Sequence, residues 1–370
     1  MGLLAGIALG LKLTFAPYAA GLGAALLATR WRSLPLYVAG VAAAALLLAG
    51  PWWWSLWEHT SNPLFPYFNE LFRSPWAPAA PMTDTRFLPG DALHAAFFPL
   101  FWAFRPSALI SELPVRDPRL ALAWIGWFVV LARAALRREL PASPIRALLA
   151  FWIVAFIAWE ARFSILRYTA TLELLSGIPV ALALARLRAR ALAPIFAAIA
   201  SITVYPDWGR ATGPLAVDVR PPAFPADTLV LLLDPAPMAY VAAFVPPSIR
   251  FAGVNSNLLH PGDDTALARA AADSIARHAG PLWGLESPAD QPGQADRALA
   301  AYHLARAPPC APVRSNLDGD AILACKLIRL QAPPRARITS LSSPPNARLI
   351  AMPASASSTK AANMRGISSR

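Results

Sequence analysis

Charged residues are scarce in this sequence of 370 residues. Asp, Glu, Lys and Arg together make up 15% of it, whereas hydrophobic residues make up 56% and the mean hydropathy is +0.44. A water-soluble protein carries about 25% charged residues, because polar groups have to cover its surface. The composition therefore excludes an ordinary soluble globule and predicts that much of the chain faces lipid.

Acidic residues are the scarcer kind of charge. The chain has 21 Asp and Glu against 33 Lys and Arg, which gives a formal net charge of +12. In a soluble protein such an excess would suggest binding to nucleic acid. Here most basic residues lie between apolar segments, as they do in the cytoplasmic loops of membrane proteins. The sequence therefore predicts no nucleic-acid partner.

Cysteine is rare, and the common catalytic motifs are missing. The chain has two cysteines and five scattered histidines, and it contains no HExxH, no CxxC pair, no GxxxxGK[ST] and no GxSxG. These absences argue against zinc hydrolases, P-loop ATPases and serine hydrolases. We expect neither a metal site nor a cofactor, and no residue is singled out as catalytic.

Long apolar runs are what the sequence does contain. About 20 apolar residues are needed to cross the roughly 30 Å hydrocarbon core of a bilayer. Six runs predict membrane spans: residues 2–29, 34–57, 119–136, 144–161, 169–185 and 191–206. The loop 58–118 is rich in proline and aromatic residues, and its segment 93–104 is too short to span, so we expect an interfacial loop. The predicted fold class is a mostly α-helical polytopic membrane protein, with a transmembrane domain over residues 1–210.

The distribution of arginine predicts the orientation of these spans. The segments 30–32, 133–146 and 186–190 carry nine Arg and one acid, whereas the loop 58–118 carries four Arg and six acids. Cytoplasmic loops are the ones enriched in Lys and Arg. We therefore expect the N-terminus, the loop 58–118 and everything after residue 206 to lie outside the cytoplasm.

The pattern changes after residue 210. Short apolar runs of β type at 228–234, 249–254 and 281–286 alternate with helix-like stretches at 236–244, 263–279 and 293–305. This alternation predicts a small α/β domain with a largely parallel sheet over residues 211–331. A last pair, 311–315 and 321–329, is separated by a turn signal typical of a hairpin. The basic tail 332–370 has no periodic apolar pattern and is expected to be disordered.

Basic residues near the apolar segments are the first candidates for function. Lys12 falls near the middle of the first predicted span, where an ammonium needs a partner or a wet cavity. Arg162 and Arg167 lie at the outer end of the fourth span, against the usual charge bias. Guanidinium groups suit phosphate oxygens, so we expect Lys12, Arg162 and Arg167 to bind the phosphate of a lipid. The alternative is an ion network of the two arginines with Glu160 and Glu173.

The string 62–75 combines rigid prolines, aromatic rings and a few polar groups beside a membrane surface. Such a mixture suits a substrate cleft that stacks against a sugar or covers a lipid head group, and it equally suits an inert interfacial helix. The polar and aromatic candidates in it are Asn62, Tyr67, Asn69, Glu70 and Arg73.

The two cysteines, Cys310 and Cys325, lie in the domain assigned to an oxidising compartment. The predicted hairpin would bring its flanks together, so we expect a disulfide. The alternative is a pair of buried free thiols.

Several strings resemble the membrane region of bacterial GT-C glycosyltransferases of the Rgt and aminoarabinose-transferase type. They are GLKLTFAPYAAGL, NPLFPYFNELFRSPW, RDPRLAL and SILRYTATLELLSGIP, and the resemblance covers roughly residues 1–205. It implies an enzyme of the bacterial inner membrane that moves a sugar from a polyprenyl-phosphate carrier to an envelope glycan or lipid. In that superfamily an acidic base lies in the first outer loop, which has no counterpart here. We therefore expect the N-terminal part to be missing, and a non-catalytic glycan or lipid carrier, or an assembly partner, is the alternative.

Overall fold

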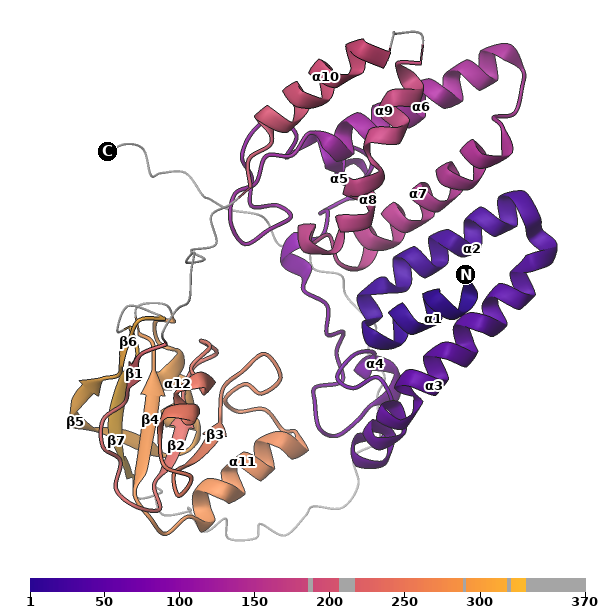
Figure 1. Cartoon of the computed structure of the whole chain (residues 1–370). Coiled ribbons are helices and arrows are strands. Elements are labelled where there is room, and N and C mark those ends of the chain that lie inside the picture. The colour runs from indigo at the N-terminus through magenta and orange to yellow at the C-terminus, as the bar shows by residue number, and fades with distance from the viewer. Residues whose placement is uncertain (186–188, 206–216, 289–290, 318–320, 331–370) are drawn as a thin grey trace, which may run out of the picture. The chain divides into compact units, whose positions relative to one another are not determined.

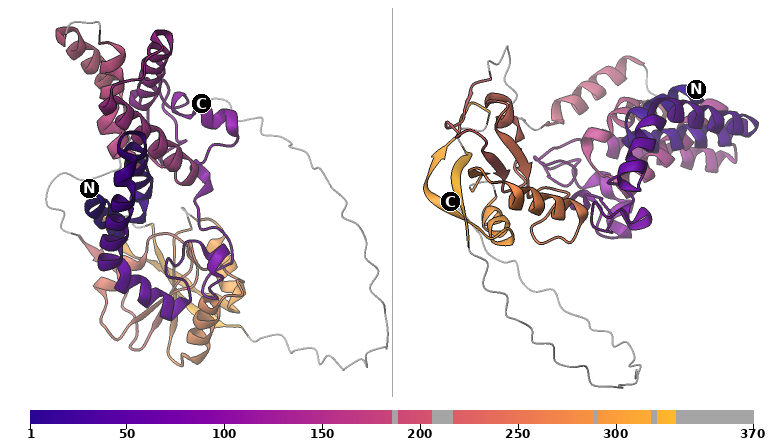
Figure 2. Two further views of the ribbon diagram at one scale, coloured as in Figure 1. Left: turned by 90° about the vertical axis from the view of Figure 1, so that its right-hand side faces the viewer. Right: turned by 90° about the horizontal axis from the view of Figure 1, so that it is seen from below.

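The computed structural model describes residues 1–185, 189–205, 217–288, 291–317 and 321–330. Residues 1–205 are mostly helical, and residues 217–329 are built around β-strands (Figure 1). Figure 2 shows the same helices and strands from two further sides. The predicted tail 332–370 lies outside the described residues.

The first predicted span, 2–29, is wrong as a single helix. The chain forms α1 (Gly2–Leu11), leaves the helix at Lys12 and, after a 3-10 turn (Leu13–Phe15), begins α2 (Ala16–Arg30). A Cβ on Gly2 would lie 2.5 Å from Tyr37 O, and one on Gly10 would lie 3.4 Å from Leu48 Cδ2, so α1 runs parallel to α3 (Leu34–Thr60). Lys12 is therefore an exposed residue at a helix break, and the start of α1 lies beside the start of α3.

Within the described residues, three helical stretches are long and apolar enough to cross a membrane. They are Leu13–Thr60, which contains α2 and α3, then α6 (Arg119–Arg137) and α7 (Ser143–Arg162). Large side chains such as Leu47 and Phe128 are exposed on them, as expected for surfaces that face lipid. The predicted spans 169–185 and 191–206 correspond to shorter helices: α8 (Ala170–Leu175), α9 (Gly177–Ala183) and α10 (Ala189–Ile202).

Close contacts through glycine fix how these helices pack. A Cβ on Gly21 of α2 would lie 2.7 Å from Phe151 O of α7, and a Cβ on Gly126 of α6 would lie 2.7 Å from Pro179 O of α9. Beside these crossings, the indole and phenyl rings of Trp102, Trp127, Trp152 and Phe156 form a fully buried core.

The contacts also show that two arginine-rich turns lie at the same end of the helices. Gly21 meets Phe151 and Ala155, while the phenol of Tyr18, one turn earlier, meets the carbonyl of Tyr168 beyond the end of α7. Helices α2 and α7 are therefore antiparallel. The turn after α2, with Arg30 and Arg32, and the turn before α7 thus share one end of the bundle, as the predicted orientation requires. The start of α1 lies beside Tyr37, one turn into α3, and therefore near this same end. The expected placement of the N-terminus on the side of the loop 58–118 is wrong for this packing.

The loop 58–118 contains short helices: α4 (Asn69–Phe72), a 3-10 turn (Thr85–Phe87), α5 (Ala92–Ala96) and a second 3-10 turn, η4 (Phe98–Leu100). It returns toward α6 through a bridge between Ser107 and Val115. Residues 93–104 are short helices rather than a span, which agrees with their length.

A five-stranded sheet forms the core of residues 217–329 (Figure 1). Its order is β3 (Arg250–Gly253), β2 (Leu229–Leu232), β4 (Leu282–Glu286), β7 (Leu323–Arg329) and β5 (Leu304–Pro312). Strands β3, β2 and β4 are parallel to one another, and β7 is antiparallel to both of its neighbours, β4 and β5. The sheet is therefore mixed and not largely parallel as expected. The predicted α/β domain is therefore confirmed as a sheet with helices, α11 (Ala266–Arg277) and α12 (Gln294–Ala301), while the predicted helix 236–244 is a 3-10 helix, η6 (Ala239–Phe244).

The last predicted pair of strands is only partly right. Strand β5 begins at Leu304, well before 311, and pairs with β7 across a bulge at Pro308 and Pro309. Residues Arg314–Ser315 form β6, which pairs with β1 (Val219–Arg220) in a separate two-stranded sheet. Part of the predicted turn, 318–319, lies outside the described residues.

Candidate functional site

The segment between α7 and α8 is where the predicted phosphate-binding residues meet. The ring of Tyr168 has two cationic neighbours: Lys12 Nζ lies 5.1 Å from its centroid and Arg167 Cζ lies 5.4 Å from it. Lys12 comes from the break between α1 and α2, and Arg167 comes from the 3-10 turn Leu166–Tyr168. Two charges that are far apart in the sequence are thus held against one aromatic ring.

The hydroxyl of Tyr18 connects the start of α2 to the 3-10 turn Leu166–Tyr168. The phenol of Tyr18, one turn into α2, donates a hydrogen bond to the backbone carbonyl of Tyr168. Tyr18 itself is buried and packs on Phe15 and Phe151. Because the chain leaves the helical conformation at Lys12, α2 can begin at this level and present its N-terminus to the site.

A cavity of about 200 Å³ lies between these turns. Its wall combines the two cations with the hydroxyl-bearing residues Thr14 and Thr171. The lining residues are Ala8, Lys12, Thr14, Phe15, Tyr18, Arg167, Tyr168, Ala170 and Thr171. This is a set of groups suited to an anion.

A second cavity, of about 250 Å³, lies on the other side of Arg167. Glu112 belongs to its wall and accepts a hydrogen bond of 3.0 Å from Arg167 Nη1. Both side chains reach solvent, with 57% of Arg167 and 35% of Glu112 exposed. Both cavities are lined by Arg167 and Ala170, and Arg167, the charged one of the two, has Glu112 as its carboxylate partner.

Glu173, also in the wall of the second cavity, has its own partners. Its carboxylate binds Arg119 Nη2 at 2.6 Å and the hydroxyl of Tyr205 at 3.1 Å, and it also accepts from Thr169. Arg119 forms a second ion pair with the buried Asp117, again at 2.6 Å. This group joins the start of α6 to α8. The sequence analysis missed it, since charges at the start of a span look like ordinary interfacial residues.

The alternative ion network of the sequence analysis is not the one formed. Among the described residues, Arg167 pairs with Glu112, and Glu173 pairs with Arg119. Arg162 lies apart from the cavity, with its guanidinium carbon 5.5 Å from the ring centroid of Phe68. The structure therefore brings together two of the three predicted phosphate-binding residues, Lys12 and Arg167.

The predicted cleft residues in the string 62–75 fall into two groups. Asn62 and Asn69 are fully buried, and their amides bind backbone groups of the same loop, for example Tyr67 O and Ala77 O at 3.0 and 2.9 Å. These two side chains shape the loop. Tyr67, Glu70 and Arg73 are exposed and remain available to a ligand.

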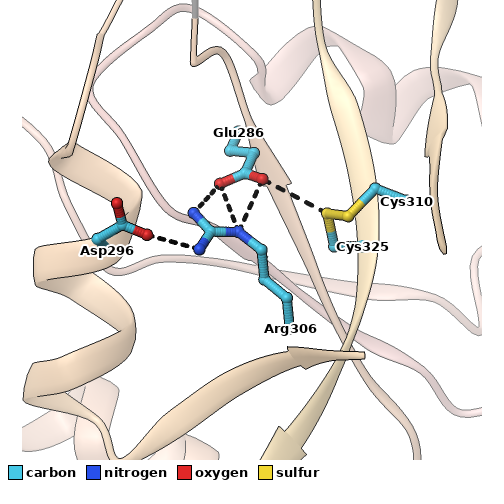
Figure 3. Close-up of a disulfide and its surroundings, with 5 residues drawn as sticks. All are labelled: Glu286, Asp296, Arg306, Cys310 and Cys325. Carbon is cyan, nitrogen blue, oxygen red and sulfur yellow. Dashed lines mark hydrogen bonds and ion pairs between the residues drawn. A yellow bond between two sulfur atoms is a disulfide. The ribbon is translucent and has the colours of Figure 1, made fainter. Parts of the chain in front are cut away.

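In the sheet, Cys310 and Cys325 are joined by a disulfide between β5 and β7 (Figure 3). The buried Glu286 lies beside it, with Oε1 3.4 Å from Cys325 Sγ, and binds Arg306 at 2.5 Å. The hydrogen bonds to Glu286 raise the pKa of the Arg306 guanidinium, which stays charged. Sulfurs bonded to each other carry no thiolate charge for a metal, so we read this cluster as structural.

Comparison with known proteins adds no family to this description. No family model, no curated protein and no solved structure matches the chain.

Proposed function

We propose that this chain is a membrane protein that binds the phosphate of a polyprenyl-phosphate sugar between Lys12 and Arg167. One observation carries the proposal: two cations from distant segments line one cavity against Tyr168. An ammonium supplies a point charge, and a guanidinium supplies a fork that matches two phosphate oxygens. The hydroxyls of Thr14 and Thr171 can donate to the remaining oxygens.

We further propose six spans in the bacterial inner membrane, formed by α2, α3, α6, α7, the pair α8–α9, and α10. The pair α8–α9 runs alongside α6. Glu173 binds Arg119 near one end of α6, and Leu182 O accepts a hydrogen bond from Arg133 near the other end. The arginine-rich turns would then be cytoplasmic. In this topology the cavity and the sheet domain are outside the cytoplasm.

Within this topology the chain would act as a glycosyltransferase that passes the sugar to an envelope glycan or lipid. The phosphate held by Lys12 and Arg167 would be the leaving group. The exposed Tyr67, Glu70 and Arg73 would form the sugar side of the cleft. Arg162, which is stacked on Phe68, lies with this loop rather than with the phosphate.

A non-catalytic carrier or assembly partner is the second candidate, and one observation favours it. The carboxylates in the wall of the second cavity already have cationic partners: Glu112 has Arg167 and Glu173 has Arg119. A nearby cation stabilises the ionised carboxylate and so makes it a weaker base for proton removal. Release of polyprenyl phosphate from a lipid-linked sugar separates the two candidates, since a carrier binds the lipid without cleaving it.

Binding of undecaprenyl phosphate to purified variants tests the phosphate site. Each charge-assisted contact is worth about 1.5–3 kcal/mol, so Arg167→Ala and Lys12→Ala should each weaken binding roughly 10- to 150-fold. Arg167→Lys should also weaken it, because the ammonium lacks the fork. Arg162→Ala is the matched control and should bind like the wild type. Unchanged binding in a folded Arg167→Ala variant would refute the site.

A further inference from the structure

Residues 93–104 have two distinct faces. Phe98, Trp102 and Ala103 are fully buried against the helical core. Five large apolar side chains on the same segment are 39–71% exposed: Leu93, Phe97, Leu100, Phe101 and Phe104. Leu93 lies in α5 and Leu100 in η4, whereas Phe97 lies between the two short helices and Phe101 and Phe104 follow η4.

The buried face fixes this segment to the start of α6. Trp102 O accepts a hydrogen bond of 3.0 Å from the amide of Asp117, just before α6, and η4 packs on α6. The ring of Phe98 lies 4.8 Å from that of Trp102, and His94 lies 4.5 Å from the exposed Phe101. The exposed rings are therefore held by a rigid base and do not belong to a loose loop.

The depth of this exposed face relative to the membrane follows from its attachment to the start of α6. Helix α6 is one of the stretches able to cross a membrane, and it exposes Ile125 and Phe128 to its surroundings. Asp117 and Arg119 form the polar end of that helix. A face tied to Asp117 is therefore level with the end of the span, where aromatic side chains are favoured at the membrane–water interface. Arg105, exposed directly after the face, is placed to reach lipid phosphates.

We propose that Leu93, Phe97, Leu100, Phe101 and Phe104 form an interfacial anchor whose partner is the bilayer itself. The anchor inserts these side chains between the head groups and acyl chains of the leaflet on the side of the loop 58–118. The anchor needs no glycosyl transfer and no phosphate site, so it can fail or hold independently of the proposed function.

Spin labels on introduced cysteines test the anchor in bilayers of phosphatidylcholine and phosphatidylglycerol. Both native cysteines are in the disulfide, so an introduced thiol is the one that reacts. Labels at Phe97→Cys and Phe101→Cys should collide more with oxygen, which concentrates in lipid, than with a water-soluble nickel chelate. Phe128→Cys on α6 is the lipid-facing control, and Ala80→Cys, exposed elsewhere in the loop, is the aqueous control.

The labels sit on exposed positions, so the buried base remains intact in both variants. Nickel accessibility at Phe97→Cys and Phe101→Cys equal to that at Ala80→Cys would overturn the anchor. Labels that neither reagent reaches, and that become mobile on dilution of the protein in the bilayer, would show a second protein copy on this face. That result would also overturn the proposal.

Discussion

Arg167 lines both cavities, and Glu112 competes with a ligand for its guanidinium. Their ion pair is partly exposed, and such pairs are worth at most about 1 kcal/mol. Glu112→Gln removes the competing charge and leaves the guanidinium free for a phosphate. We therefore expect Glu112→Gln to bind undecaprenyl phosphate up to about fivefold more tightly than the wild type. Weaker binding by this variant would mean that Glu112 supports the ligand site and does not compete with it.

The pair of Glu286 and Arg306 is a different case because Glu286 is buried. Arg306→Met leaves that carboxylate without its partner, which typically costs about 3–5 kcal/mol. The double variant Glu286→Leu/Arg306→Met removes both charges and should regain most of this loss. Asp296→Asn, on the exposed side of Arg306, should cost less than 1 kcal/mol or so. The free energy of unfolding of each of the three variants can be measured by urea unfolding of the full chain in detergent, with proteolytic cleavage within residues 217–329 as the readout. Equal losses of stability in Arg306→Met and in the double variant would contradict the expectation.

At the scale of elements, the contact of α2 with α7 depends on the absence of a side chain at Gly21. A Cβ there would lie 2.7 Å from a backbone oxygen, so one of the helices has to move. We expect Gly21→Ala to lower the free energy of unfolding in detergent by about 1–3 kcal/mol, as overpacking does. Gly23→Ala in the same helix is the control, since its Cβ would meet Tyr37 at an ordinary 3.6 Å. Equal stability of the two variants would show that α2 does not pack closely on α7.

The sequence predicted some elements well and missed others for physical reasons. Strands β2, β3 and β4 were found because short apolar runs bounded by polar or turn residues read as buried strands. The first residues of strand β5 were missed, and its bulge lies at Pro308 and Pro309, which an edge strand tolerates. The helix break at Lys12 was missed, since apolarity alone does not show where a chain reverses. Lys12 itself was the available signal, because a charge is more stable at a helix end than within a span.

The candidate site was predictable as a set of unusual charges and not as a geometry. Lys12 and Arg167 stood out because they are basic residues beside apolar segments. Their meeting at Tyr168 depends on the reversal between α1 and α2, which the sequence did not reveal. The residue type of Asn62 and Asn69 does not show whether their amides bind a ligand or the backbone of their own loop. Only the contacts of their amides distinguish the two roles.

For the whole molecule, two topologies are possible, with six membrane spans or with four. They differ in the side of the membrane on which α9 ends. The pair α8–α9, Ala170–Ala183, is about 21 Å long at 1.5 Å per residue, which is short for a bilayer of roughly 30 Å. Its contacts with both Arg119 and Arg133 nevertheless place it along most of α6. A short span can be accommodated by local thinning of the bilayer. We therefore expect Ala185, exposed just after α9, to lie on the cytoplasmic side.

Labelling of Ala185→Cys with a membrane-impermeant maleimide measures this directly. The native cysteines are bonded to each other, so the introduced thiol carries the signal. Ala80→Cys in the loop 58–118 should react in intact cells, whereas Ala142→Cys between α6 and α7 should react only after the membrane is opened. Ala185→Cys should behave like Ala142→Cys if α8–α9 crosses the membrane. If it reacts in intact cells, α8–α9 turns back within the bilayer, and the spans are then α2, α3, α6 and α7 alone.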